Sequence, residues 1–139
     1  MSQRIFITGA NGMLGASVTR EALSQGFQVR AQILPGTSRQ VLADLPIEII
    51  EGNILDNQFL DQAISGCQYV INIAALTTTW PRRLESLYAV NLQGVKNITA
   101  AAQKHQIKRM VQIGTANSFN HGPKEAPGDE KQPYKGDQF

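Results

Sequence analysis

Short runs of apolar residues alternate along the chain with longer segments in which apolar residues recur every three or four positions. Short apolar runs bounded by turn residues are typical of buried strands, whereas the longer periodic segments are typical of helices. Leu14, Val18 and Ala22, for example, share one face of a helix that ends before Gly26. We therefore expect strands over 5–8, 28–33, 47–50, 69–73 and 109–113, and helices over 13–25, 39–45, 56–64 and 82–103.

Apolar strands separated by helices predict an α/β fold, in which helices cover both faces of a parallel sheet. Right-handed crossovers then give a Rossmann-type, doubly wound sheet with the strand order 3-2-1-4-5. Ligands of such sheets bind at the carboxyl ends of the strands, where the order reverses between strands 1 and 4. Three dipeptides that follow strands meet at this edge: Thr8-Gly9, Ala74-Ala75 and Gly114-Thr115.

The segment Thr8-Gly9-Ala10-Asn11-Gly12-Met13-Leu14-Gly15 links the first predicted strand to the first predicted helix. In this setting the first glycine allows a tight turn, the second lets backbone amides approach a pyrophosphate, and the third lets the helix pack close to the sheet. The phosphates then lie at the positive end of the helix. This pattern predicts a dinucleotide site, although Gly12 and Gly15 also suit a helix start that binds no ligand.

Composition narrows the class of protein. The 139 residues fit one domain, and 42% hydrophobic residues with a net charge of +2 give no reason to expect a nucleic-acid or membrane partner. The chain begins without a signal-peptide pattern and has a single cysteine, Cys67, so we expect a cytoplasmic protein and a semi-buried thiol. No spacing of Cys and His predicts a metal site, and His105 and His121 are expected to face solvent.

The composition changes after Thr115. Residues 116–139 are rich in Asn, Gly, Pro, Lys, Asp and Gln and contain almost no aliphatic side chains. Such a segment cannot bury enough apolar surface to form a core of its own. We therefore divide the chain into a partial dinucleotide-binding domain over residues 1–115 and a polar loop or disordered tail over residues 116–139.

Several short motifs appear together in a characteristic order: the glycine segment, Asn72-Ile73-Ala74-Ala75, Asn91-Leu92-Gln93-Gly94 and Gly114-Thr115-Ala116. With this order the chain resembles the extended short-chain dehydrogenases/reductases, a superfamily of NAD(P)-dependent epimerases, dehydratases and reductases. The interval from Ala74-Ala75 to Trp80, together with Asp129-Glu130, is most similar to the dihydroflavonol-4-reductase-like branch. The resemblance implies a sheet that lacks only its sixth strand, and a parent enzyme that forms a homodimer.

The resemblance also implies roles for individual residues. Thr115 would hydrogen-bond the substrate oxygen, and Asn91 would act from a locally distorted helix whose backbone holds a water. Both have simpler alternatives, because Thr115 also suits a loop cap and Asn91 an ordinary polar position on a helix. The implied cofactor-binding residues are Gly9, Gly12 and Gly15 around the pyrophosphate, Asn11, Met13 and Leu14 along the turn, Asn53 and Ile54 beside the adenine, and Ala74 and Ala75 beside the ribose.

The choice between NAD and NADP depends on the end of the second strand. An NAD site usually carries an Asp or Glu about 20 residues past the glycines, where it accepts hydrogen bonds from the ribose. Here that region reads Gln32-Ile33-Leu34-Pro35 and contains no carboxylate. Arg39 is the nearest candidate to bind a 2′-phosphate, which favours NADP over NAD, although Arg39 also suits a solvated helix position.

The catalytic pair that the resemblance implies, Tyr-x-x-x-Lys, is absent from this sequence. Tyr69, Tyr88 and Tyr134 are followed four positions later by Ile73, Leu92 and Gln138. We therefore expect the N-terminal part of a longer enzyme of ~300 residues, without activity on its own. The favoured function is that of a reductase that transfers hydride to the carbonyl of a small molecule. The alternatives are a sugar-nucleotide epimerase or dehydratase, and a non-catalytic regulator that senses nicotinamide cofactors.

Overall fold

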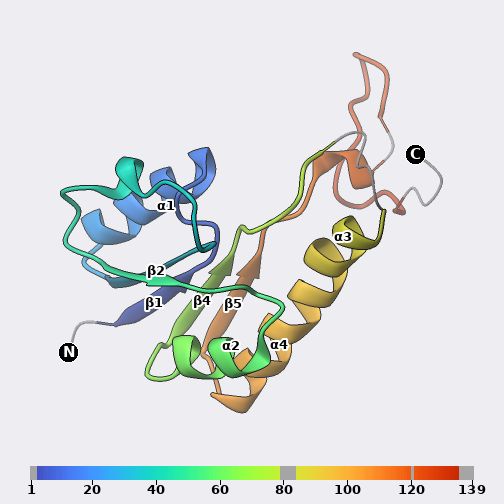
Figure 1. The fold of residues 1–139 in the computed structure, drawn as a ribbon. Coiled ribbons are helices and arrows are strands. Elements are labelled where there is room, and N and C mark those ends of the chain that lie inside the picture. The colour runs from blue at the N-terminus through green and yellow to red at the C-terminus, as the bar shows by residue number, and fades with distance from the viewer. Residues whose placement is uncertain (1–2, 79–83, 120, 135–139) are drawn as a thin grey trace.

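The computed structural model describes residues 3–78, 84–119 and 121–134, so the predicted corner at Trp80 lies outside the described residues. Within these ranges five parallel strands form one sheet in the order β3-β2-β1-β4-β5 (Figure 1). This order confirms the prediction from the sequence, including the reversal between β1 and β4. The strands are β1 (Arg4–Ile7), β2 (Gln28–Ile33), β3 (Glu48–Glu51), β4 (Tyr69–Asn72) and β5 (Arg109–Gln112).

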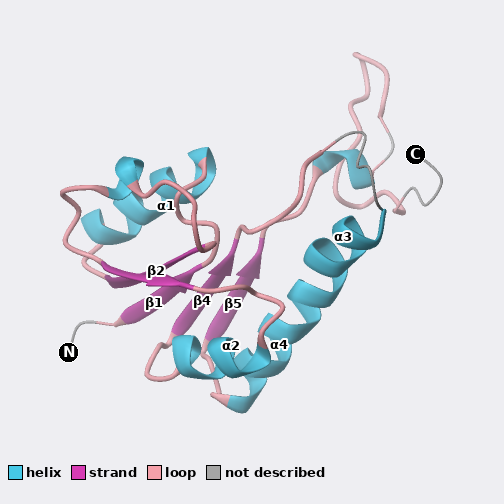
Figure 2. Ribbon diagram, in the orientation of Figure 1, coloured by secondary structure: helices cyan, strands magenta, loops and turns pink. Residues whose placement is uncertain are grey.

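Helices cover the two faces of the sheet (Figure 2). Helix α1 (Met13–Ser24) packs on one face, where Ala16 and Ala22 join a buried cluster with Ile5, Ile7 and Ile33. Helices α2 (Asn57–Ile64) and α4 (Val95–Lys104) pack on the other face. The buried cluster on that second face contains Phe6, Ile54, Leu60, Ala63, Ile64, Cys67, Val70, Ile98 and Ala101.

The helix expected over 39–45 is wrong in length, because the structure contains only a single 3-10 turn, η1 (Gln40–Leu42). The turn cannot continue, since Asp44 has a φ of 65° and Pro46 follows within two residues. Leu42 is almost fully buried in the cluster beneath α1, so the segment still contributes to the core.

The long helix expected over 82–103 is also divided. Within the described residues it consists of α3 (Leu84–Tyr88), a π-helical segment η2 (Ala89–Gly94) and α4, which ends at Lys104. A π-helical turn inserts extra backbone into a helix and is frequent at functional sites. The distortion that the family resemblance implied around Asn91 therefore coincides with a local feature of this fold.

The segment after β5 contains little regular structure in its described part. The 3-10 turn η3 (Ala116–Ser118) follows Thr115, and the rings of Phe119 and Tyr134 stack with their centroids 5.0 Å apart. An isolated antiparallel bridge joins the same two residues. The division of the chain after residue 115 stays a prediction.

The two histidines differ from each other. His121 is exposed, as expected, but the prediction that His105 faces solvent is wrong. Only 22% of the His105 side chain is exposed, and its Nε2 lies 2.7 Å from Asp61 Oδ1. The reason is that His105 follows the last residue of α4, where its ring contacts Asp61 on the neighbouring helix α2. Cys67 is more deeply buried than the expected semi-buried thiol, with only 6% of its surface exposed, and burial raises the pKa of the thiol.

Candidate functional site

The glycine turn between β1 and α1 is fixed by two close backbone contacts. Gly9 has a φ of +61°, and a Cβ on it would lie 3.0 Å from the Cα of Ala74. A Cβ on Gly15 would lie 2.1 Å from the carbonyl oxygen of Gly9. Neither position can carry a side chain without moving backbone, so the first and third glycines are required by the fold itself.

Gly12 differs from Gly9 and Gly15 in having room for a side chain. It is the N-cap of α1 with a φ of −75°, and an added Cβ would meet only the Gly9 carbonyl oxygen, at an ordinary distance of 3.4 Å. The fold therefore leaves room for a side chain here. Because the first amides of α1 lead from this position, the open space lies where an anion would bind the helix N-terminus.

The residues that flank Gly12 divide into two groups. Met13 and Leu14 expose their side chains, by 91% and 44% respectively, on the first turn of α1. Asn11 instead faces the segment after β2, where its Nδ2 donates to Thr37 Oγ1 at 2.9 Å and to the Ser38 carbonyl at 2.8 Å. Asn11 thus ties the glycine turn to residues 37–38, in addition to its predicted place along the turn.

A row of polar side chains crosses the carboxyl edge of the sheet next to this turn. The buried Thr8 hydroxyl donates to Asn72 Oδ1 and accepts hydrogen bonds from the amides of Ile73 and Ala74, at 3.0 and 3.1 Å. Asn72 Nδ2 in turn donates to Gln112 Oε1 at 2.7 Å. These bonds hold the backbone after β4 against β1, and so set the position of Ala74 beside Gly9.

Gln32 extends this row onto β2, one residue after Ala31, which pairs in register with Ile7. Its side chain is 97% buried, accepts a hydrogen bond from the Gly9 amide at 3.0 Å and donates to the Gly52 carbonyl at 2.6 Å. The glycine turn is thereby linked to the loop after β3. From the sequence, Gln32 is noted only because its region contains no carboxylate. Its role could have been predicted from the presence of a polar residue at a core-facing position of a strand.

The residues expected near the adenine and the ribose lie in the segments that follow β3 and β4. Asn53 is exposed, and its Oδ1 accepts a hydrogen bond from the Leu55 amide at 2.9 Å. The Ile54 side chain is buried and packs so close to Gly94 that a Cβ on Gly94 would lie 2.5 Å from it. Ala75 is exposed at the end of β4, next to the partly buried Ala74.

Arg39 lies just before η1 with 65% of its side chain exposed. Its Nη2 is 3.8 Å from Oε1 of Glu51, the last residue of β3. Glu51 is paired in register with Ile33, the last residue of β2. The structure therefore places one cation and one carboxylate beside the end of β2, although β2 itself ends without a charged residue.

The two residues with predicted catalytic roles both bond to nearby backbone. Asn91, inside the π-helical segment, accepts a hydrogen bond from the Leu76 amide at 2.8 Å and donates to the Leu76 carbonyl at 2.9 Å. Thr115 is exposed and caps η3, because its Oγ1 accepts a hydrogen bond from the Asn117 amide at 3.2 Å. These contacts fit the simpler alternative for each side chain, and leave the catalytic roles as predictions.

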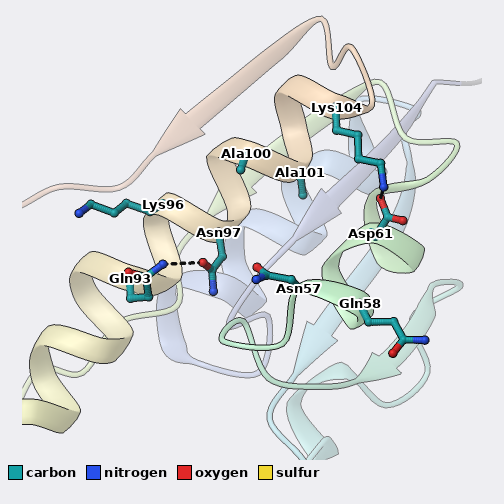
Figure 3. A pocket seen from close by; sticks show the side chains of 9 residues that line it. All are labelled: Asn57, Gln58, Asp61, Gln93, Lys96, Asn97, Ala100, Ala101 and Lys104. Atoms are coloured by element: carbon teal, nitrogen blue, oxygen red, sulfur yellow. Dashed lines mark hydrogen bonds and ion pairs between the residues drawn. The ribbon is translucent and has the colours of Figure 1, made fainter.

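A separate groove of about 620 Å³ lies between α2 and α4, lined largely by polar residues (Figure 3). It lies on the face of the sheet opposite α1. Lys104 Nζ and His105 Nε2 both contact Asp61 Oδ1, at 2.8 and 2.7 Å. Hydrogen bonds from Lys104 and then from His105 hold the pKa of the Asp61 carboxyl below its ordinary value. No group of side chains in the described ranges could hold a metal ion, and no helix there is long and apolar enough to cross a membrane.

A glycine turn that leads into a helix at the switch point of a parallel sheet defines a Rossmann-type dinucleotide-binding domain. Comparison with known proteins agrees with this class. The chain belongs to the NAD dependent epimerase/dehydratase family, whose sequence profile matches residues 5–138.

Similar proteins include reductases and an enzyme solved in complex with NAD and UDP. A dihydroflavonol 4-reductase-like protein of Synechocystis is 39% identical over 80% of this chain and 32% of its own length. The 2-alkyl-3-oxoalkanoate reductase of Shewanella oneidensis is 27% identical over 93% of this chain and 33% of its own length.

Among solved structures, the Bordetella bronchiseptica enzyme WbmG in complex with NAD and UDP superposes with a TM-score of 0.82. It is 28% identical to this chain, and the match covers 97% of this chain and 44% of WbmG. The chain therefore spans about a third of the curated relatives that it matches and less than half of this structural neighbour.

Proposed function

We propose that these 139 residues form the nicotinamide-cofactor site of a reductase that resembles the dihydroflavonol-4-reductase-like enzymes and transfers hydride to a carbonyl group. The identity of 39% to the Synechocystis protein supports this branch over others in the family. In such a reaction the bound nicotinamide supplies or accepts the hydride. The residues of this chain bind and orient the cofactor.

One observation carries the proposal. Gly9 and Gly15 are required by backbone contacts within the protein, but Gly12 is not, because the fold leaves ordinary space for a Cβ there. A ligand that approaches the backbone at the start of α1 accounts for a glycine at this position. The pyrophosphate of a dinucleotide has the negative charge that the helix N-terminus favours.

The Gly12→Val variant tests this proposal directly. A branched side chain at Gly12 should abolish binding of NADH and NADPH, since it occupies the space of the pyrophosphate. The same variant should unfold within about 1 kcal/mol of the wild type, because the N-cap has no other close contact. Cofactor titration by fluorescence and urea unfolding measure the two effects. Unchanged cofactor affinity in a folded Gly12→Val protein would reject the site.

We further propose that the cofactor is NADP in preference to NAD, with Arg39 as the partner of the 2′-phosphate. Arg39 is exposed at the carboxyl edge, where the segment after β2 is tied to the glycine turn by Asn11. The Arg39→Ala variant should weaken NADPH binding by about tenfold, the effect of one charge-assisted contact, and change NADH binding by less than twofold. Equal losses for the two cofactors would remove Arg39 from this role.

A second candidate is an epimerase or dehydratase that acts on a sugar nucleotide. The observation in its favour is the structural similarity to WbmG, which was solved with NAD and UDP. The two candidates predict different activities for the longer parent protein. A parent reductase should oxidise NADPH in the presence of a carbonyl substrate, whereas a parent epimerase should convert a UDP-sugar without net oxidation of added cofactor. In either case we expect the 139 residues alone to show no turnover.

A further inference from the structure

Glu51 occupies a position from which it can influence the choice of cofactor. In NAD sites the acidic residue that binds the ribose usually lies at the end of the second strand. Here the second strand lacks it, but the pairing of Ile33 with Glu51 brings a carboxylate from the end of β3 to the same edge. Glu51 is 45% exposed, so its carboxylate is accessible to a ligand at that edge.

The same carboxylate faces Arg39, whose Nη2 is 3.8 Å from Glu51 Oε1. The segment that carries Arg39 is held in place, because Thr37 Oγ1 donates to the Leu34 carbonyl at 2.6 Å and accepts from Asn11. Arg39 is therefore kept near Glu51 and near the glycine turn at the same time. A 2′-phosphate that reaches Arg39 has to compete with Glu51 for the guanidinium.

We propose that Glu51 is a selectivity residue that lowers the affinity of this site for NADP relative to NAD. It acts in two ways: it pairs with Arg39, and its negative charge repels a phosphate dianion bound nearby. NAD has no 2′-phosphate, so neither effect applies to it. This inference rests on the proposed dinucleotide site at Gly12 and on the role of Arg39 in that site.

The expected size of the effect is limited by solvent. An exposed ion pair with one long contact is worth little, and repulsion between exposed charges is screened by salt. Together they predict that Glu51→Gln tightens NADPH binding about three- to tenfold at low salt and changes NADH binding by less than twofold. The gain should shrink as ionic strength rises, because screening weakens both contributions.

The experiment compares the dissociation constants of NADPH and NADH for the full chain and four variants: Glu51→Gln, Glu48→Gln, Arg39→Ala and the double variant Arg39→Ala/Glu51→Gln. Glu48→Gln is the matched control, since Glu48 lies at the other end of β3 and also pairs with an arginine, Arg30, at 2.9 Å. It should leave both affinities unchanged. Relative to Arg39→Ala, the double variant Arg39→Ala/Glu51→Gln should gain NADPH affinity only by the small part that repulsion alone supplies.

Two results would overturn the inference while leaving the proposed function intact. One is NADPH affinity that is the same in wild type and Glu51→Gln, with NADH still bound. The other is an equal gain in Glu48→Gln, which would indicate a general effect of net charge. If the folded wild type binds neither cofactor, the proposed function fails and the inference fails with it. Unfolding curves of each variant establish that the proteins compared are folded.

Discussion

The buried side chain of Gln32 offers the sharpest test of how this site is held together. Its two hydrogen bonds, to the Gly9 amide and the Gly52 carbonyl, connect the loops that follow β1 and β3. Methionine has a similar length and volume but can make neither bond. The Gln32→Met variant therefore removes the connection and keeps the packing of the strand.

The expected loss of stability in Gln32→Met follows from the backbone groups that lose their hydrogen-bond partner. A buried backbone group without a partner costs about 1–3 kcal/mol, and the variant leaves two such groups. The Gly9 amide is only partly buried, so we expect a total loss of about 2–4 kcal/mol in the free energy of unfolding. Such a loss is a large part of the roughly 5–15 kcal/mol that stabilises a typical domain.

Urea unfolding of the wild type and two methionine variants measures this loss. Gln28→Met is the control, because Gln28 lies on the same strand but is exposed, and its side chain accepts a long hydrogen bond of 3.4 Å from Arg4. It should change the free energy of unfolding by no more than about 0.5 kcal/mol. If Gln32→Met is as stable as Gln28→Met, the connection between the two loops contributes nothing.

A Gln32→Glu variant separates this polar role from packing. Burial disfavours the charged carboxylate and raises its pKa above the ordinary value of about 4.3 for glutamate, so the protonated form predominates in the fold at mild acidity. A protonated carboxyl group can again donate to the Gly52 carbonyl. The deficit relative to wild type should therefore be largest near neutral pH and shrink as the pH falls toward about 4. A deficit that is independent of pH would contradict the hydrogen-bonding role.

Two further predictions concern the glycine turn and the contact between α2 and α4. Gly15→Ala should cost at least about 3 kcal/mol in the free energy of unfolding, because its Cβ would lie 2.1 Å from the Gly9 oxygen; an alanine variant with wild-type unfolding would contradict the close approach of α1. Asp61 has a lowered pKa, so its contribution to stability is present above its ordinary pKa of 3.8 and is lost as the pH falls through the lower, folded-state value. The stability advantage of wild type over Asp61→Asn should thus shrink as the pH falls below 3.8, and an advantage that does not change with pH would contradict the pairing with Lys104 and His105.

The order of the strands could be predicted from the sequence because it depends on few choices. Alternating strands and helices with right-handed crossovers leave a small number of topologies, and the glycine turn identifies the switch point. The glycine roles at Gly9 and Gly15 were also predictable, since they are local properties of a turn between a strand and a helix. The early end of η1 could not be predicted, because a helix-like pattern gives no sign of the positive φ at Asp44 that prevents the helix from continuing.

The contacts that shape the site could not be predicted for a different reason. Thr8, Gln32, Asn72 and Gln112 stand 24 or more positions apart in the sequence, and they meet only once the register of four strands is known. The pairing of Arg39 with Glu51 likewise requires β3 to lie beside β2. A single sequence shows Thr8, Gln32, Asn72 and Gln112 near the ends of predicted strands, but not which of them face the same side of the sheet.

Because these polar side chains hydrogen-bond within the protein, they affect which groups are available to bind the proposed cofactor. Gln32 bonds to the backbone of Gly9 and Gly52, and Asn72 bonds to the side chains of Thr8 and Gln112. Asn11 and Asn91 bond to neighbouring loops. Few side chains at the carboxyl edge are therefore left to contact a cofactor. In the proposed site, affinity for a pyrophosphate would then come largely from backbone amides at the start of α1, which depend on the correct position of the turn. For that reason a buried residue such as Gln32, which need not contact the cofactor, should affect binding as strongly as a residue that does.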